Sequence, residues 1–381
     1  MIKQYDYIII GAGCAGLSLL MRLLDKNAGA KVLLIDRTEK NTNDRTWCYW
    51  EKEAGYFDNI VYRKWNELNF CDDDGYKQLS MGDYTYKMIR GIDFYTHCFN
   101  RIQQAPGVAF QTAEIQAVEV TGKHCSIKAA GHTIEAAAGF IFSSIPNKAE
   151  AGSNIISLLQ HFKGWIIRTT GNSNIKPCLM DFRVDQSAGT AFVYTLPLDE
   201  NSALIEYTVF SSTVLQDAQY DNVLKNYIEH MLQIKAYAIE HTEYGVIPMT
   251  NQRFPFYKDG MYHIGSAGGQ TKPSSGYTFS FIQKQSADIA AALKACDSLK
   301  QNNPAPRFRL YDSILLKILH DNIMPGKAIF SRLFQSLPAH KIFKFLDNET
   351  TPAEELSILN SMPAKIFLPV AIRQLIKQLR D

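Results

Sequence analysis

The sequence predicts an α/β fold with a three-layer nucleotide-binding domain, an inserted and mainly antiparallel β-sheet domain, and a helical C-terminal region. Three patterns support this prediction. The chain opens with a strand, a glycine turn, a helix and a second strand. Long strands with alternating side chains fill the middle, and apolar residues at helical spacing recur in residues 301–381. The 381 residues are about twice a usual domain length, which fits two interleaved domains.

The opening unit carries the strongest signal. An apolar run at residues 7–10 leads directly into the spacing Gly-x-Gly-x-x-Gly at residues 11–16. Gly11 permits a tight turn, and Gly13 lets the backbone approach a pyrophosphate. Gly16 lets the next helix pack closely on the sheet. The spacing therefore predicts a dinucleotide site.

The elements after this turn agree with that prediction. The helix begins at Cys14 and Ala15, where free N–H groups and a positive dipole end would face the phosphates. The second strand, residues 31–35, ends at Asp36, and 36 − 16 = 20 residues separate this acid from Gly16. A ribose-binding carboxylate is expected at this distance.

Composition narrows the function classes. Hydrophobic residues make up 46% and charged residues 20%, which is typical of a globular enzyme and excludes a disordered chain. The net charge of +2 gives no overall field for nucleic acid, so no nucleic-acid partner is expected. Seven scattered cysteines without a C-x-x-C pair argue against disulfides and against a metal site, and they favour a reducing, cytoplasmic compartment. We expect neither a leader before Tyr5 nor a membrane-spanning run.

The segment after Asp36 contains an unusual aromatic cluster. Residues 45–50 read Arg-Thr-Trp-Cys-Tyr-Trp, which fits either a packing lid over the nucleotide site or an aromatic wall for a large apolar ligand. A predicted helix at residues 92–102 would place Arg90 near the cofactor, although Lys87 and Arg90 could also be plain surface charges. We count Arg37, Arg45 and Arg90 among the candidate cofactor contacts.

The middle of the chain predicts strands. Residues 190–196 and 202–210 are predicted to form a hairpin. In its second strand, alternation places Glu206 on one face, which we expect to roof a ligand cavity, and Tyr207 on the other. The helical spacing of residues 220–240 then predicts an amphipathic helix.

A second glycine turn follows at residues 265–269, before a predicted helix over 278–296. It either brings backbone N–H groups to a flavin ring or pyrophosphate, or is an ordinary strand-to-helix turn. The chain has one Gly-x-Gly-x-x-Gly motif, which stands at its very start, and the sheet-built insert separates it from the second turn. We therefore predict one tightly held dinucleotide, FAD. The candidate contacts here are Gly265, Ala267, Gly268, Gly269 and Gly276.

These elements predict a discontinuous, Rossmann-like FAD-binding domain. Its pieces are residues 1–75, 95–150 and 255–300; the substrate-binding β-sheet domain comprises 76–94 and 151–254, and the helical region 301–381. Near the end of the chain, Ile372, Leu375 and Ile376 recur at helical spacing, and residues 363–381 carry a net charge of +3. This helix could lie on an anionic membrane surface or dock on the body of the protein.

At these residues the chain resembles the flavoprotein lycopene β-cyclases of bacteria and plants along nearly its whole length. The matching segments are 7–16 with Asp36, Arg45-Thr46-Trp47, 86–94, Met180-Asp181-Phe182-Arg183, Leu204-Ile205-Glu206-Tyr207-Thr208, Gly245-Val246-Ile247-Pro248 and 265–277. The segment Pro273-Ser274-Ser275-Gly276-Tyr277 is the most telling. Related flavin hydroxylases usually have Gly-Asp where this chain has Gly265-Ser266.

The resemblance implies cyclisation of lycopene ends to β-rings, giving β-carotene through a monocyclic intermediate without net redox change. It implies reduced FAD with NAD(P)H as electron donor, and Glu206 as the proton-donating acid. Asp181 would be a second proton acceptor or a structural acid. Some family members carry a second acid directly after the first, where this chain has Tyr207. The carotenoid substrate implies docking of a cytoplasmic protein on the membrane surface.

Two other interpretations remain open from the sequence. A flavin-dependent monooxygenase or isoprenoid reductase on the same scaffold would consume NAD(P)H in proportion to product. A flavin-binding carrier of apolar ligands would form no rings.

Overall fold

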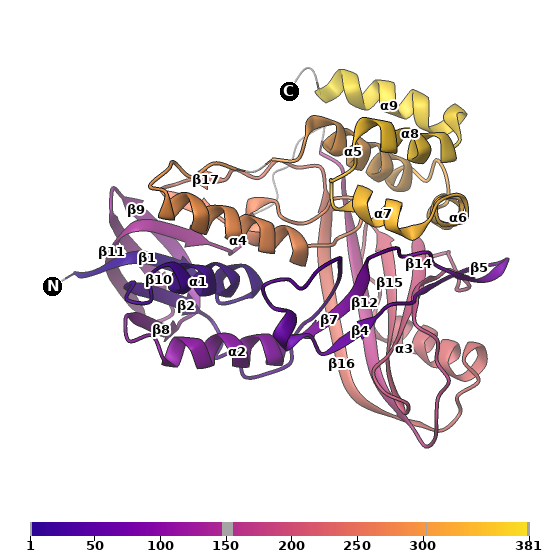
Figure 1. Cartoon of the computed structure of the whole chain (residues 1–381), viewed down its shortest axis with the longest axis horizontal. Coiled ribbons are helices and arrows are strands. Elements are labelled where there is room, and N and C mark those ends of the chain that lie inside the picture. Colours follow the sequence, from indigo (N-terminus) through magenta and orange to yellow (C-terminus); the bar gives the residue numbers. More distant parts are fainter. Residues whose placement is uncertain (1, 147–154, 302, 379–381) are drawn as a thin grey trace.

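The computed structural model describes residues 2–146, 155–301 and 303–378 (Figure 1). Its first sheet is built around the N-terminal strand. In spatial order this sheet contains β17 (Tyr257–Lys258), β18 (Met261–His263), β11 (His132–Ser143), β1 (Lys3–Ile10), β2 (Val32–Asp36) and β8 (Val108–Thr112), and β10 (His124–Ala129) and β9 (Ile115–Thr121) extend from β11. Strands β18, β11, β1, β2 and β8 run parallel to one another, as in a nucleotide-binding sheet, whereas β17 and β10 pair with them antiparallel.

This sheet is the middle of three layers. Ile9 and Leu34 pack under the helices α1 (Cys14–Lys26), α2 (Gly91–Gln103) and α4 (Phe279–Lys294). Ile8 and Leu33 point the other way, toward β9 and β10. The predicted three-layer domain is therefore confirmed.

The second sheet is mainly antiparallel. In spatial order it contains β16 (Tyr237–Thr250), β12 (Ser157–Thr169), β15 (Ser202–Ser211), β14 (Thr190–Pro197), β13 (Cys178–Asp181), β5 (Asn69–Asp72) and β6 (Gly75–Gln78). Strands β14 and β15 form the predicted hairpin. A third sheet is small. In spatial order it contains β3 (Thr46–Glu51), β7 (Thr85–Arg90) and β4 (Arg63–Trp65).

The two faces of the seven-stranded sheet have different covers. Helix α3 (Asp217–Asn226) and the π-helical turn Tyr227–Met231 pack on one face, against Ile205 and Tyr207. The opposite face, with Leu204 and Phe210, packs toward β3, β7 and the C-terminal helices. The alternation predicted for this strand is thus observed.

The C-terminal helices lie together above the seven-stranded sheet in Figure 1. They are α5 (Pro306–His320), α6 (Gly326–Ser336), α7 (Ala339–Leu346), α8 (Pro352–Ser361) and α9 (Ala364–Gln378). Short 3-10 turns occur at Asp58–Ile60 and Gly265–Gly268. None of the helices in the described ranges is both long and apolar enough for a transmembrane span.

Two sequence expectations differ from the structure. The helix predicted over residues 220–240 ends at Met231, and β16 begins at Tyr237, because the apolar spacing stops at Met231. The predicted domain boundary after residue 75 also differs from the sheet topology. Strand β5 lies before it, yet pairs with β13 in the seven-stranded sheet.

Candidate active site

The three glycines of the first turn meet different surroundings. Gly11 has φ +101°, and a Cβ there would lie 2.1 Å from Ser144 Oγ. A Cβ at Gly16 would lie 1.9 Å from the Gly11 carbonyl oxygen, so helix α1 packs too closely for any other residue. A Cβ at Gly13 would meet no atom within 4 Å. The backbone is therefore open at Gly13, where a pyrophosphate would approach.

Asp36 lies at the end of β2 beside this turn. Its carboxylate accepts the Ala12 N–H at 2.7 Å and pairs with Lys40 Nζ at 3.1 Å. Arg37 is exposed. The turn and the acid thus form one unit that could hold the adenosine half of a dinucleotide.

The other two candidate arginines are engaged by their neighbours. Arg45 Nη1 donates to the Asp44 carbonyl oxygen at 2.8 Å. Arg90 pairs with Asp93 at 2.6 Å, and its guanidinium carbon lies 3.8 Å from the centre of the Tyr62 ring. Nothing in these contacts directs either arginine toward the glycine turn.

The second glycine turn packs on the first helix. Gly265 has φ +61°, and a Cβ there would lie 2.6 Å from the Ala15 Cβ. Ala267 and Gly268 are buried, and Gly269 ends the 3-10 turn in the left-handed region with φ 76°. The two turns are therefore neighbours in space, as a shared cofactor requires.

The loop that follows, residues 272–277, reaches the second sheet. Gly276 has φ +72°, and a Cβ there would lie 2.1 Å from Gln160 Oε1 on β12. The buried atoms Gln160 Oε1 and Ser275 Oγ have no hydrogen-bond partner among the described residues. Buried polar groups are rarely left unpaired in proteins, so these two fit a site for a polar ligand such as a flavin ring.

Two carboxyl groups face each other beside this loop. Glu206 on β15 and Glu243 on β16 both lie opposite Gly164 of β12, in one row across three strands. A Cβ at Gly164 would lie 3.4 Å from the Glu206 Cβ and 3.2 Å from the Glu243 Cγ. The missing side chain at Gly164 therefore leaves room for the two acids, which we call the acid pair.

The environment keeps a proton on the acid pair. Burial raises the pKa of Glu206 well above its ordinary value, and the charge of Glu243 and a hydrogen bond with it raise the pKa further. Thr208 Oγ1 donates to Glu206 at 3.0 Å, and Thr46 Oγ1 donates to Glu243 at 2.6 Å. Glu206 is surrounded by protein yet keeps some accessible surface, as a side chain bordering an internal space does.

Apolar and aromatic groups surround the acid pair. Burial, with the charges of Glu206 and Glu243, raises the pKa of the Cys48 thiol well above its usual value. The Tyr277 ring lies edge-on to Trp50 at 4.4 Å between centroids, and burial raises the pKa of its phenol to about 12. These two groups stay neutral near pH 7, so neither adds a charge beside the acid pair.

The two faces of the aromatic segment pack on different parts of the molecule. In β3, Trp47 and Tyr49 pack on Phe279 of α4, with ring centroids 6.2 Å and 4.3 Å away. Cys48 and Trp50 point the other way, into the cluster around Tyr277. Alternate residues therefore pack under the nucleotide domain and line the acid-pair region.

Asp181 lies on the opposite face of the sheet from Glu206. It is fully buried; Arg183 contacts both its oxygens at 2.9 and 2.6 Å, and Tyr227 OH donates to it at 2.6 Å. These partners belong to the α3 side. Of the two roles expected for Asp181, this geometry matches a structural acid and not a proton acceptor.

The position after Glu206 cannot supply the second acid either. Tyr207 points to the α3 side, as does every odd-numbered residue of β15 from 203 to 209. Sequence reasoning missed Glu243, because the assignment of residues 220–240 to a helix hid the alternation of β16. Only the pairing of β16 with β12 reveals its place.

Comparison with known proteins decides the family. A family model described as lycopene cyclase protein matches residues 6–371. This chain belongs to the lycopene cyclase family. The lycopene beta-cyclase of Pantoea ananas is 24% identical over 383 residues, which cover 95% of this chain and 96% of that protein. The lycopene beta cyclase of Synechococcus elongatus is 22% identical over 311 residues, covering 77% and 72%.

Solved structures show the same fold for this lycopene cyclase family member. A flavoprotein/dehydrogenase from Cytophaga hutchinsonii superposes with a TM-score of 0.65 at 11% identity, covering 99% of this chain and all of that one. A geranylgeranyl bacteriochlorophyll reductase-like protein from Thermoplasma acidophilum gives 0.61 at 13% identity, with the same coverage. The predicted flavoprotein fold class is confirmed. No cluster of potential metal ligands occurs within the described ranges.

Proposed function

We propose that this chain is a lycopene β-cyclase, an FAD-dependent isomerase of the intramolecular lyase type. It would convert the linear ψ-ends of lycopene to β-rings and form β-carotene through γ-carotene. The observation that carries the proposal is the acid pair, whose buried Glu206 keeps its proton near neutral pH. Protonation of an unactivated double bond requires such an acid in a dry, apolar place.

Each ring closure balances without an oxidant. Glu206 gives its proton to the terminal double bond, and one C–H bond forms. The carbocation is attacked by the neighbouring double bond, and one C–C bond closes the ring. A C–H bond next to the new cation then breaks, and its proton returns to the acid pair. Glu243, facing Glu206 across Gly164, is placed to take part in this return.

FAD is the cofactor that the glycine turns fit. Gly11, Gly13 and Gly16 with Asp36 would hold its adenosine half, and the 272–277 loop would hold the ring. Reduced FAD would supply negative charge that stabilises a nearby carbocation. NAD(P)H would serve as electron donor for the flavin and would not be consumed per ring.

The C-terminal helix fits peripheral attachment of a cytoplasmic protein to a membrane. Helix α9 docks on the body through the buried residues Val370 and Gln374. Its other face leaves Ile372, Leu375 and Ile376 between 45% and 51% exposed. A helix with an outward apolar face can lie in a lipid interface, where lycopene is dissolved.

The test is turnover by purified, flavin-loaded protein with lycopene in liposomes under reducing conditions in D2O. We expect β-carotene with one solvent deuterium per ring, at carbon positions that do not exchange. Nicotinamide oxidised should stay far below the number of rings formed. Unchanged lycopene, or one nicotinamide oxidised per product, would contradict the proposal and favour a carrier or a monooxygenase or reductase.

A further inference from the structure

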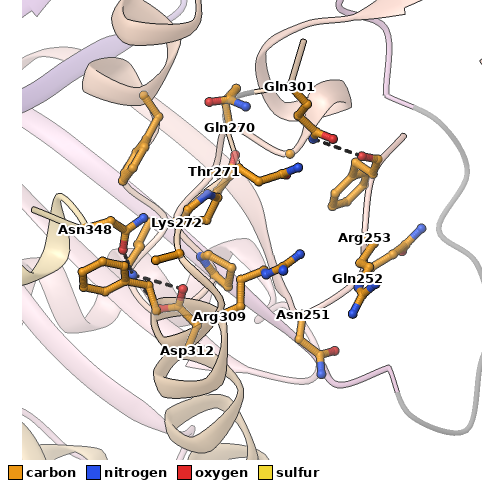
Figure 2. A pocket seen from close by; sticks show the side chains of 18 of the residues that line it. Asn251, Gln252, Arg253, Gln270, Thr271, Lys272, Gln301, Arg309, Asp312 and Asn348 are labelled. Carbon is orange, nitrogen blue, oxygen red and sulfur yellow. Dashed lines mark hydrogen bonds and ion pairs between the residues drawn. The ribbon is translucent and has the colours of Figure 1, made fainter. Parts of the chain in front are cut away.

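A cavity of about 720 Å³ lies apart from the acid pair, between the end of β16, helix α4 and the C-terminal helices (Figure 2). Neither acid lines it. Its size suits a small-molecule ligand. The segment 269–273, which belongs to the second glycine turn and the loop after it, forms one wall. The cavity therefore shares one wall with the candidate flavin site.

Most charged groups around this cavity are paired. Lys272 is buried and bonds Asp312 at 2.8 Å and Asn348 at 2.6 Å, as the dashed lines in Figure 2 show. The other pairs are Lys284 with Glu349 at 2.7 Å and Arg307 with Glu355 at 2.9 Å. Three carboxylates are thus engaged by these cations, and Asp347, which also lines the cavity, accepts a hydrogen bond from Trp50 Nε1 at 2.7 Å.

Arg253 and Arg309 differ from these groups. Within the described part of the chain, no hydrogen bond or ion pair reaches either guanidinium, and Arg309 Nε is buried without a partner. Burial, and then the charge of Arg253, lower the pKa of Arg309. Both arginines line the cavity, Arg253 exposed and Arg309 partly buried, and an anion bound beside them would relieve their repulsion.

We propose that this cavity binds a phosphate-bearing organic anion between Arg253 and Arg309. The guanidinium fork matches phosphate oxygens, and such charge-assisted bonds are stronger than neutral ones. The aromatic rings of Phe254 and Phe281 and the amide of Gln270 also line the cavity and suit the organic part. The phosphate could belong to a soluble nucleotide or to a lipid headgroup.

The experiment uses full-length, flavin-loaded protein, so that the phosphates of the flavin do not compete. Pyrophosphate, NADH and NADPH are titrated by calorimetry, and vesicles of phosphatidylcholine with and without phosphatidylglycerol are tested by flotation. The variants are R253Q, R309Q and the double variant. The matched control is R63Q, an exposed arginine on β4 that does not line the cavity and lies away from α9.

We expect at least one phosphate probe to bind, and the double variant to bind it at least about tenfold more weakly, equivalent to about 1.4 kcal/mol. R63Q should bind as the wild type does. Arginine-dependent binding of NADH or NADPH assigns the site to a nucleotide. Arginine-dependent binding of the anionic vesicles alone assigns it to a lipid headgroup. R309Q without ligand should melt no lower than wild type, because it removes a repulsion.

Two results would overturn the proposal. One is the absence of binding by every phosphate probe; the other is equal binding by wild type and double variant. A lower melting temperature of R309Q with unchanged affinity would show a structural arginine and would also overturn it. These readouts do not involve lycopene, so failure of cyclisation would leave the assignment of this cavity standing.

Discussion

The two faces of the seven-stranded sheet treat buried polar groups in opposite ways. On the α3 face, His161 bonds Tyr220 at 2.6 Å and Ser211 at 2.8 Å, and Asp181 bonds Arg183 and Tyr227. On the other face the acid pair faces carboxyl to carboxyl. Polar atoms on that face, such as Gln160 Oε1, have no partner in the described residues.

This difference separates structure from chemistry. A buried acid held by a guanidinium and a phenol is fixed in place, and losing the acid would leave both partners without a hydrogen-bond acceptor. A buried acid facing another acid keeps a proton at an unusually high pKa, which is typical of active sites. Sequence alone presents Asp181 and Glu206 as similar candidates, and only their faces distinguish them.

The sharpest test of the comparison exchanges the two acids in turn for their amides. Glu206→Gln should lower the rate of β-ring formation about 10³-fold or more, because the amide cannot donate the proton. Asp181→Asn should leave activity per folded molecule nearly unchanged but lower the free energy of unfolding by about 3 kcal/mol, since it leaves Arg183 unpaired. Chromatography of products and denaturant unfolding measure the two effects.

The stability of Glu206→Gln provides the control for folding. The folded-state pKa of Glu206 is raised, so its contribution to stability is fully present below the unfolded value of 4.5 and is lost as pH rises through the folded pKa. Glutamine does not ionise, so the Glu206→Gln variant does not lose stability in this way as pH rises. It should therefore melt higher than wild type at about pH 9. A lower melting temperature at that pH would contradict the assigned environment.

The second carboxyl gives the next largest effect. Glu243→Gln should slow cyclisation about 10- to 100-fold, because the acid pair loses one of its two proton sites. It should also move the alkaline limb of the pH–rate profile to lower pH, since the charge of Glu243 helps to raise the pKa of Glu206. Glu240→Gln, an exposed acid on the same strand, is the control. An unmoved limb would separate Glu243 from the proton chemistry.

The space at Gly164 gives a smaller effect. Gly164→Ala places a methyl group 3.0 Å from Leu204 Cδ1 and 3.2 Å from Glu243 Cγ, so the acid pair must shift by a few tenths of an ångström. We expect a loss of activity of about 3- to 10-fold. Gly171→Ala, where the methyl group would meet open space, should have no effect on the rate. Equal activity of both variants would show that the spacing of the acids is not critical.

The smallest effect lies on the α3 face. Tyr227→Phe removes one hydrogen bond to Asp181 and leaves the Arg183 pair intact. The free energy of unfolding should fall by about 2 kcal/mol, and the rate of cyclisation should not change. A slower rate at unchanged stability would mean that the α3 face takes part in the chemistry.

Local patterns predicted much of the fold. The glycine spacing at residues 11–16, the hairpin around β14 and β15 and the helix α4 each follow from a signal within one stretch of chain. The alternation of side chains along β15 also placed Glu206 and Tyr207 on opposite faces of the sheet. Glu243 could not be predicted, because its role depends on strand pairing across about eighty residues of chain, which no local pattern encodes.

The buried ion pair of Lys272 with Asp312 has a consequence for how the molecule comes apart. The Lys272 ammonium group belongs to the loop beside the candidate flavin ring. Its partners are Asp312 on α5 and Asn348, which follows α7 in the chain. If the C-terminal helices detached, the Lys272 ammonium group would lose both of its partners. The tail and the ring-binding loop should therefore lose protection from hydrogen exchange together, and a clipped tail should release the yellow chromophore.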